Sequence, residues 1–292
     1  MHINDHKGRQ SLCQSRPKSK KKVIGDTNHS IISSPISIPV YKNSSSIRRK
    51  VAALVDSVFD KRLLVSSFDS YPFVTNCYLE STYDSYCGRG TATLISPYCL
   101  VTAGHNLWHN GKFPTRIVCS IGMNGNLTID TSRVNTFYVH PKYLESENSD
   151  YDMGIVRIEK PFGKTYGSMS LSIHDTKDLV GMLVNVTGYP AQKKFHEILL
   201  DRPSNHMYTM KGAIRSITDH QMHYEVDTSG GQSGSAVWVD NKENSADCIA
   251  VHTHGNKIDG NGAVRITNES GETLKEWLLK LERDGESRVE SD

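Results

Sequence analysis

Short β-rich segments separated by turn residues fill most of this chain, and they restrict its fold more than any other feature. From Val58 onward these runs are rich in valine, isoleucine, leucine and threonine. Examples are residues 91–95, 99–102, 116–119, 154–158, 182–186 and 248–251. Because helical periodicity is nearly absent until the end of the chain, the pattern predicts β-barrels or sandwiches rather than βαβ units.

Length and charge limit the organisation and the partners. At 292 residues the chain reaches the size where one hydrophobic core stops growing, so we expect two compact units of roughly 100 residues each. The 34 Lys and Arg nearly balance the 32 Asp and Glu, which gives no reason to expect a nucleic-acid partner. No apolar run approaches the roughly 20 residues of a membrane helix, so we expect no membrane partner.

The two ends of the chain differ from this β-rich body. Residues 1–56 carry basic clusters at 16–22 and 48–50, and they indicate a poorly ordered leader or pro-segment. A localisation signal or an anion-binding patch is the alternative for the first cluster. Near the other end, apolar residues at helical spacing predict an amphipathic helix that docks on the core, with a partner-binding helix as the alternative. These residues are Leu274, Trp277, Leu278 and Leu281.

The cysteines and the N-terminus say little about the compartment. The six cysteines are Cys13, Cys77, Cys87, Cys99, Cys119 and Cys248. They form no C-x-x-C pair, so neither a zinc module nor a disulfide framework is indicated, although one or two bridges are compatible with them. The polar, basic N-terminus lacks the apolar region of a secretory signal, so export cannot be inferred from it.

Three local patterns suited to acyl transfer occur in the order His, Asp, Ser. In the first, an apolar strand ends in His105 just after a small-residue turn. A general base needs such a rigid position, with one ring nitrogen free for the nucleophile. In the second, Asp150 and Asp152 lead into the apolar run 154–158. Asp152 adjoins this run, so we select it as the carboxylate that accepts the Nδ1 hydrogen of His105, whereas Asp150 fits a solvated turn.

The third pattern, residues 227–237, is the most specific. Glycines on both sides of Ser233 allow the backbone angles that aim the amide hydrogens of Gly231 and Ser233 at one point, an oxyanion hole. Ser233 is then the nucleophile. A flexible glycine-serine linker is the alternative reading, but an Ala-Val-Trp-Val run follows and leads into another strand. Ser235 is the competing serine, and it lies past the loop on the strand side.

The loop around Ser233 resembles the active-site serine loop of the trypsin-like superfamily, and in particular that of bacterial glutamyl endopeptidases. The resemblance extends from about Ser57 to Leu281. It includes residues 139–143, upstream of the aspartate, residues 186–190, in the second barrel, and residues 251–255 and 261–264, in the pocket wall. It implies the all-β chymotrypsin-like fold, with two six-stranded antiparallel Greek-key barrels and a C-terminal α-helix.

This resemblance also implies the boundaries of the units. They are a leader over 1–56, a first barrel over 57–165 with His105 and Asp152, a second barrel over 166–270 with Ser233, a helix over 271–285, and a disordered tail over 286–292. Mature relatives begin at a position that corresponds to Ser57 or Val58. Removal of the leader is therefore expected to free an α-amino group that completes the specificity pocket.

The family's roles carry over position by position. They imply a serine endopeptidase with His105 as general base, Asp152 as its partner and Ser233 as nucleophile, and with Gly231 and Ser233 as oxyanion donors. Thr228 and His252 match the pair that recognises a substrate glutamate. Cleavage after Glu, and more weakly after Asp, is expected because a buried carboxylate needs such donors.

The resemblance also carries expectations about specificity, partners and cofactors. Asp227 stands where trypsin-like enzymes carry an acidic pocket residue, so a preference for Lys or Arg is the alternative. The family implies a secreted monomer that acts on protein or peptide substrates. Acyl transfer by a triad requires no cofactor and no metal, although a structural calcium ion is compatible with it. Two positions depart from it. Cys87 lacks the usual cysteine partner because Asn106 follows the histidine, and His254 replaces a small or amide residue.

Two other functions compete with this one. His105 with His109, and His252 with His254, raise the possibility of a metal-dependent hydrolase. The first pair lacks the Glu of H-E-x-x-H, and no further ligand follows at a suitable spacing. A non-catalytic binding protein with the protease fold is the second rival. The intact set of His105, Asp152, Ser233 and flanking glycines argues against it.

Overall fold

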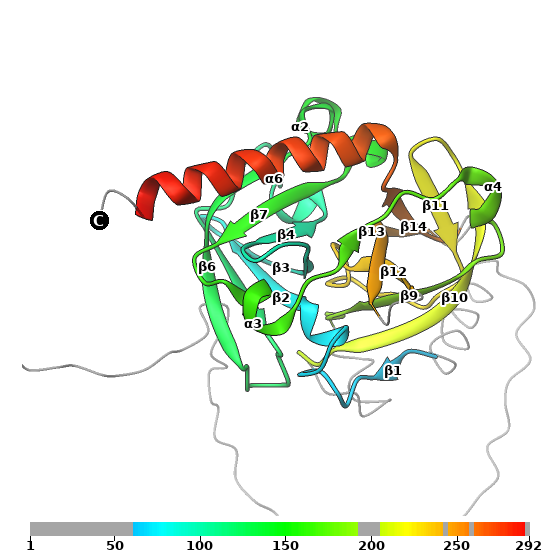
Figure 1. Ribbon diagram of the computed structural model, residues 1–292, viewed down its shortest axis with the longest axis horizontal. Coiled ribbons are helices and arrows are strands. Elements are labelled where there is room, and N and C mark those ends of the chain that lie inside the picture. The colour runs from blue at the N-terminus through cyan, green and yellow to red at the C-terminus, as the bar shows by residue number, and fades with distance from the viewer. Residues whose placement is uncertain (1–60, 192–204, 242–244, 257–259, 290–292) are drawn as a thin grey trace, which may run out of the picture. The chain divides into compact units, whose positions relative to one another are not determined.

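The first half of the described chain forms a closed antiparallel barrel. The structure is a computed structural model, and it describes residues 61–191, 205–241, 245–256 and 260–289. The strands are β2 (Asn76–Thr82), β3 (Cys87–Leu94), β4 (Cys99–Thr102), β5 (Arg116–Ile121), β6 (Asp130–Val139) and β7 (Gly154–Ile158). They pair in the order β2-β3-β4-β7-β6-β5, and β5 pairs back with β2 to close the barrel (Figure 1).

The second half repeats this strand order. Its strands are β9 (Leu183–Gly188), β10 (Tyr208–Ile217), β11 (Gln221–Tyr224), β12 (Ala236–Asp240), β13 (Ala246–Asn256) and β14 (Gly260–Arg265). They pair in the order β9-β10-β11-β14-β13-β12, and β12 pairs back with β9. Two short strands extend the edges, because β1 (Leu63–Leu64) joins β10 and β8 (Ser170–Leu171) joins β13. The predicted pair of six-stranded barrels is thus confirmed.

Burial on both faces explains why β4 and β7 read as continuous apolar runs. Leu100 and Val156 point into the first barrel and are completely buried there. Their neighbours Val101 and Ile155 point outward and join a separate core cluster that includes residues of α6 and of the second barrel. Since each strand alternates its side chains between two buried faces, the usual alternation of polar and apolar residues disappears.

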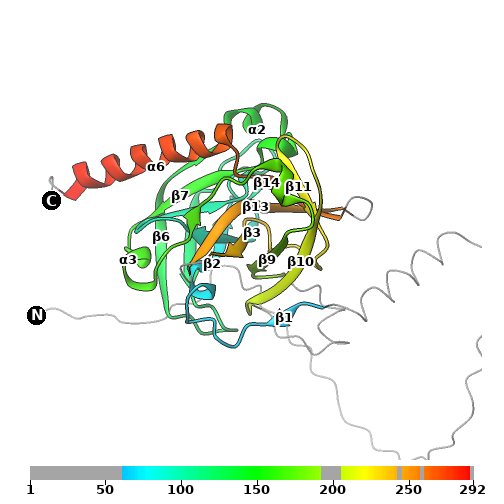
Figure 2. The same ribbon diagram turned by 45° about the vertical axis from the view of Figure 1, so that its right-hand side comes forward.

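The α-helices of the described segments are few and lie outside the barrels. They are α2 (Pro141–Ser146), α3 (Phe162–Tyr166), α4 (Thr176–Leu179) and α6 (Asn268–Val289). Helix α6 runs along the outside of the first barrel beside β6 and β7, in both views (Figures 1 and 2). Leu274, Trp277 and Leu281 are buried in the cluster that includes Ile155, so this helix docks on the core.

The ends of α6 differ from the expected range 271–285. The helix begins at Asn268, where Thr267 and Ser270 exchange hydrogen bonds between side chain and backbone and so satisfy free amide groups. It continues to Val289, so residues 286–289, expected in a disordered tail, are helical. The expected leader, residues 1–56, lies outside the described residues.

The cysteines of the described segments fall into two groups. Cys77, Cys99, Cys119 and Cys248 are free and buried. Cys87, at the start of β3, is disulfide-bonded. Across the described segments, no helix is both long and apolar enough to cross a membrane.

Candidate active site

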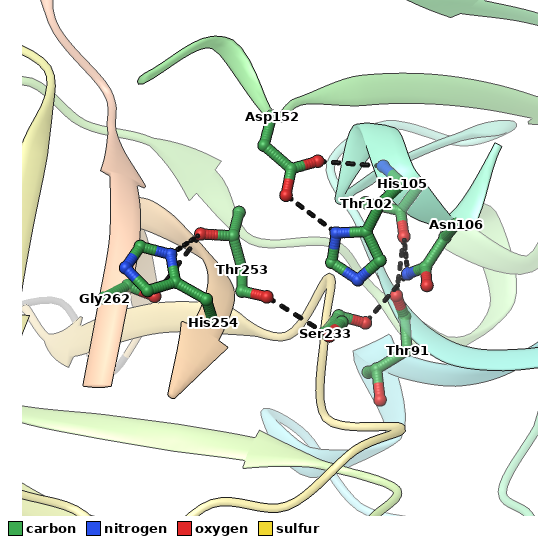
Figure 3. Close-up of polar contacts among 9 residues, drawn as sticks. All are labelled: Thr91, Thr102, His105, Asn106, Asp152, Ser233, Thr253, His254 and Gly262. Atoms are coloured by element: carbon green, nitrogen blue, oxygen red, sulfur yellow. Dashed lines mark hydrogen bonds and ion pairs between the residues drawn. The ribbon is translucent and has the colours of Figure 1, made fainter. Parts of the chain in front are cut away.

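His105 is held by both carboxylate oxygens of Asp152. It lies in a short 3₁₀ turn, Gly104–Asn106, directly after β4. Its ring Nδ1 is 2.7 Å from Asp152 Oδ2, and its backbone amide donates to Asp152 Oδ1 at 2.8 Å (Figure 3). A Cβ on Gly104 would lie 3.1 Å from Asp152 Oδ1, so the glycine leaves the carboxylate room to approach. Ring orientation and backbone position are thereby fixed by the same side chain.

Of the two candidate aspartates, Asp152 is the one that contacts His105. It follows the 3₁₀ turn Ser149–Tyr151 and precedes β7, and only 6% of its surface is exposed. The backbone amide of Asp150 donates to Asn148 in the exposed turn before it. The geometry therefore matches the expectation that Asp152 meets the imidazole and Asp150 belongs to the turn.

The environment of His105 raises its pKa. Burial of the ring acts to lower the pKa, but the negative charge of Asp152 and the hydrogen bond to it together outweigh burial. The protonated imidazole is therefore stabilised by the neighbouring carboxylate. This is the charge state that a general base acquires when it accepts a proton from a hydroxyl group.

Ser233 lies on a loop that is tied to the first barrel. Its carbonyl accepts hydrogen bonds from the Thr91 amide and from Asn106 Nδ2, both at 2.9 Å. Its hydroxyl donates to the Thr253 carbonyl at 3.3 Å, and within the described residues no hydrogen bond joins it to His105. In the view of Figure 3, the His105 ring lies between Asp152 and Ser233. Hydrogen bonds of this kind often align only when a substrate binds.

Glycines beside Ser233 give its loop an unusual backbone. Gly231 has a φ of 92° and Gly234 a φ of 90°, which is left-handed backbone that favours glycine. A Cβ at position 234 would come within 2.0 Å of the Thr91 carbonyl oxygen, so this position also needs glycine for space. Within the described chain, the amides of Gly231 and Ser233 donate to no protein acceptor. They are two available donors on either side of Gln232.

His252 is a buried neutral histidine. It lies on β13 with 2% of its surface exposed, and its Nδ1 is 2.6 Å from the phenol oxygen of Tyr224. Burial, followed by the charges of His254 and His105, lowers its pKa to about 3, although a backbone hydrogen bond at Gly262 acts in the opposite direction. The imidazole is thus uncharged at any pH near neutrality.

Thr228 and Asp227 make contacts that their sequence pattern did not reveal. The Thr228 hydroxyl donates to Asn261 Oδ1 at 2.8 Å, and Asn261 Nδ2 donates in turn to the Val226 carbonyl. The carboxylate of Asp227 accepts a hydrogen bond from the backbone amide of Lys61 at 2.8 Å. The side chain of Thr228 is thus bonded to β14, and the side chain of Asp227 is bonded to the segment before β1.

His254, the second departure from the family, packs on β14. Its Nδ1 lies 2.9 Å from Thr253 Oγ1, and a Cβ on Gly262 would come within 2.4 Å of its Nε2. The ring therefore covers the surface that the missing side chain of Gly262 leaves open. It also meets His223 edge to face, with ring centroids 6.1 Å apart.

The histidine pairs considered as metal ligands point to different partners. The ring of His109 contacts Tyr83 and Tyr86, with centroids 5.9 and 5.1 Å away, rather than His105. A β-bulge separates His252 from His254. Among the described residues, no group of three or more His, Cys, Asp or Glu side chains is arranged to hold a metal ion.

Several contact residues of this site have no local sequence signal. Tyr224 and Asn261 meet the predicted pocket residues only through strand pairing of β11, β13 and β14. In the sequence, Asn106 is distinguished only as the residue that replaces a cysteine of the family. Arg62 donates to Ser229 and to Gln232, which lie more than 160 positions away along the chain.

Comparison with known proteins gives consistent matches. Residues 66–277 match the family described as Trypsin. The chain is 30% identical over 226 residues to a glutamyl endopeptidase of Bacillus licheniformis, covering 75% of this chain and 67% of that protein. It is 26% identical over 245 residues to a Bacillus subtilis protein named extracellular metalloprotease, covering 82% and 75%. Against a glutamyl endopeptidase of Staphylococcus aureus it is 26% identical over 216 residues, covering 70% of this chain and 58% of that one.

Solved structures show the same architecture. A structure described as Glu endopeptidase in complex with MPD aligns with a TM-score of 0.63 and 24% identity, over 74% of this chain and 95% of that one. The protease Anisep from Arthrobacter nicotinovorans aligns with a TM-score of 0.54 and 14% identity, over 66% and 89%. At these identities, the matches establish the two-barrel fold.

Proposed function

Because this chain belongs to the trypsin family of serine proteases, we propose that it is a serine endopeptidase whose catalytic residues are Ser233, His105 and Asp152. One observation carries the proposal. Asp152 forms hydrogen bonds with both the ring and the backbone amide of His105. Asn106, the next residue, connects this turn to the loop that carries Ser233 and the available amides of Gly231 and Ser233. This arrangement of orienting acid, base, nucleophile and oxyanion donors is what acyl transfer requires.

In the first half of the reaction, the Ser233 oxygen attacks the carbonyl carbon of the scissile peptide bond. His105 takes the hydroxyl proton on Nε2, while Asp152 holds the Nδ1 hydrogen and stabilises the imidazolium. The amides of Gly231 and Ser233 donate to the oxyanion that develops in the tetrahedral intermediate. The proton then passes from His105 to the leaving amine, and an acyl-enzyme remains on Ser233.

In the second half, water attacks the acyl-enzyme by the same route. His105 removes a proton from the water, the oxyanion again lies against the two amides, and Ser233 leaves with the proton that His105 returns. The raised pKa of His105 suits both halves, because the ring must accept a proton in one step and give it up in the next.

We further propose that the enzyme prefers Glu, then Asp, before the scissile bond. Glutamyl endopeptidases among the relatives support this preference. The Tyr224 phenol can donate to Nδ1 of His252, which leaves the hydrogen of the neutral ring on Nε2. The ring would donate this hydrogen to the substrate carboxylate in place of the Gly262 backbone. Thr228 would be the second donor, after its hydroxyl hydrogen turns from Asn261 to the substrate.

The alternative preference for Lys or Arg requires that the carboxylate of Asp227 face the substrate. The contact with the Lys61 amide occupies one of its oxygens and directs it to the segment before β1. This observation favours Glu over a basic residue, since the remaining residues of the predicted pocket are neutral donors and acceptors.

The proposal extends to secretion, maturation and the extent of the two barrels. We propose a secreted monomer that is made with a leader over 1–56 and that carries its two barrels over 57–165 and 166–270. The name of the Bacillus subtilis relative, which describes an extracellular protein, supports secretion. Protein or peptide chains are the substrates, as in the protease family to which the chain belongs.

Two assays test the proposed function. A fluorophosphonate probe should label the protein at Ser233, and prior denaturation should abolish labelling. A peptide library digested with the protein and analysed by mass spectrometry should show cleavage mainly after Glu. An unlabelled folded protein would support a non-catalytic binding function, and cleavage mainly after Lys and Arg would overturn the Glu preference.

A further inference from the structure

Residues 61–65, which we call the strap, cross the loop that carries the oxyanion donors. The strap is anchored on both sides of Arg62. Before it, the Lys61 amide donates to Asp227 Oδ2 at 2.8 Å. After it, Leu63–Leu64 pairs with β10, and the Val65 amide donates to the Met207 carbonyl at 2.9 Å. Arg62 is therefore held in place by the backbone on either side.

The guanidinium of Arg62 bridges two residues of this loop. Its Nη1 donates to Ser229 Oγ at 2.7 Å and to Gln232 Oε1 at 3.0 Å. The guanidinium carbon also lies 5.9 Å from the centroid of the Tyr208 ring, a cation–π contact that orients the group. The two hydrogens of Nη1 thus connect Ser229, near the beginning of the loop, to Gln232 in its middle.

Gln232 is the centre of this arrangement. Only 1% of its surface is exposed, and its Oε1 also accepts from the Ser229 amide at 3.0 Å. If the side-chain amide of Gln232 were rotated by half a turn, its NH₂ group would face the two donors, Arg62 Nη1 and the Ser229 amide, and could not accept from them. These two hydrogen bonds therefore fix the orientation of the amide. Because Gln232 lies between Gly231 and Ser233, fixing its side chain also fixes the backbone that joins the two oxyanion donors.

We propose that Arg62 is the positioning residue of the oxyanion hole, which it orders by holding Gln232 and Ser229. The inference rests on the proposed function above. In this role Arg62 acts through Gln232 and Ser229 rather than on the substrate. Its contacts keep the amides of Gly231 and Ser233 directed at one point, and preorganised donors of this kind accelerate acyl transfer. Because Arg62 follows Ser57 and Val58 in the sequence, it is present both in the precursor and in a mature chain that begins at either residue.

Substitutions of Arg62 test this role, with Lys61 as the matched control. Arg62→Met keeps the apolar stem and removes the donors, whereas Arg62→Lys keeps a charged nitrogen donor on a shorter side chain. Lys61→Ala changes a neighbouring exposed side chain and leaves the backbone bond to Asp227 in place. The assays are kcat and KM on a Glu-containing peptide substrate, and amide hydrogen exchange over residues 227–235.

We expect Arg62→Met to lower kcat by roughly 10- to 100-fold, less than the loss of a whole oxyanion donor. KM should change much less, because the contact acts on the transition state rather than on substrate binding. Exchange over the loop should become faster in the same variant. Arg62→Lys should fall between Arg62→Met and the native protein, and Lys61→Ala should keep kcat within about twofold of the native value.

A double-variant cycle separates positioning from general destabilisation. Gln232→Met should lower kcat as Arg62→Met does, and the two together should cost no more than either alone, because both break the same link. Fully additive losses, or unchanged kcat and exchange in Arg62→Met, would overturn the proposal. If Arg62→Met does not fold, Gln232→Met decides, since native-like kcat and exchange in that variant contradict the bridging role.

Failure of the proposed function has a different outcome. A native protein with no hydrolysis that depends on Ser233 would overturn the protease assignment and, with it, the catalytic meaning of Arg62. In an active protein, unchanged kcat in the Arg62 variants overturns the positioning role and leaves the protease assignment standing.

Discussion

Asn106 donates a hydrogen bond from its side-chain Nδ2 to the backbone carbonyl of Ser233 at 2.9 Å. The same nitrogen donates to Thr102 Oγ1 at 3.0 Å (Figure 3). The turn that carries His105 is thus tied to the loop that carries Ser233, although the two belong to different barrels. The position that the family resemblance assigns to a disulfide cysteine serves here as a polar link across the site.

Removing this link should weaken both the fold and the reaction. Asn106→Leu keeps a similar volume and loses both donated hydrogen bonds, so we expect a loss of about 1–2 kcal/mol in the free energy of unfolding. The value of kcat should also fall, because Ser233 loses one of two restraints on its carbonyl. Urea denaturation and steady-state kinetics measure these effects. Asn110→Gly, in an exposed turn at a φ of 50°, is the control and should leave both nearly unchanged.

The two serines of the loop should respond in opposite ways. Ser233→Ala should reduce turnover by about a thousandfold or more, since the nucleophile is lost. Ser235 is completely buried, and its hydroxyl has no hydrogen-bond partner among the described residues. Ser235→Ala should therefore keep most of the activity. Kinetic measurement of both variants decides, and an active Ser233→Ala with an inactive Ser235→Ala would reverse the assignment.

The fold could be predicted from the sequence, and the residues proposed as catalytic could be named from it, because their signals are local. Strands such as β4 and β7 are apolar over consecutive positions, and the glycines beside Ser233 have left-handed backbone that few other residues adopt. Arg62 offers no comparable signal, because its acceptors Ser229 and Gln232 are 167 and 170 positions away. Such a contact depends on the docking of β1 against the second barrel, which no local pattern encodes.

The contacts of the predicted pocket could not be predicted from the sequence either, because they join residues that are distant along the chain. His252 and Thr228 were predicted by resemblance, but their partners Tyr224 and Asn261 lie 28 and 33 positions away along the chain. Their positions follow from the register of β11, β13 and β14. The length of α6 also exceeded the prediction, since its apolar stripe ends before the helix does.

Asp152→Asn should be far more damaging than Asp150→Asn. An amide in place of the Asp152 carboxylate would favour the wrong tautomer of His105, and a loss of kcat on the order of a thousandfold or more is expected. Asp150→Asn changes a residue that does not contact the imidazole and should cost little. Equal losses in the two variants would contradict the choice of Asp152.

The pH profile provides an independent measure of the same pair. The catalytic base must be neutral, and the pKa of His105 is raised, so activity should rise with pH through a midpoint above the ordinary histidine value of about 6.5. In Asp152→Asn the carboxylate charge is gone, so the midpoint of the residual activity should move to lower pH. A profile of kcat/KM from pH 4 to 9 measures both, and a midpoint that stays in place would contradict this coupling.

Maturation should remove the leader by a cut on the N-terminal side of the strap, so that residues 61–65 remain in the mature chain. The change in composition near Ser57 and the family resemblance predict a new terminus at Ser57 or Val58, which leaves Arg62 in the mature chain. Arg48, Arg49 and Lys50 offer sites for an earlier cleavage by another protease. N-terminal sequencing of the active enzyme tests this prediction, and active protein that begins at Met1 would refute it.

The preference for Glu should persist in acid because His252 acts as a neutral donor. Its pKa of about 3 lies well below the range in which the protease can be assayed, so its charge state should not change between pH 5 and 8. The ratio of kcat/KM for matched Glu and Gln substrates should therefore show no transition that belongs to His252. Titration of a charged histidine would instead lower the ratio as the pH rises and the positive charge is lost.

Three variants distinguish a neutral donor from a positive charge at this position. His252→Ala should abolish most of the discrimination between Glu and Gln, whereas His252→Gln keeps an N–H donor and should retain part of it. Tyr224→Phe removes the partner of Nδ1, so the neutral ring can place its hydrogen on either nitrogen and the discrimination should fall to an intermediate value. If the Ala and Gln variants lose discrimination equally, or if Tyr224→Phe matches the native protein, neutral donation by His252 is not the origin of the preference.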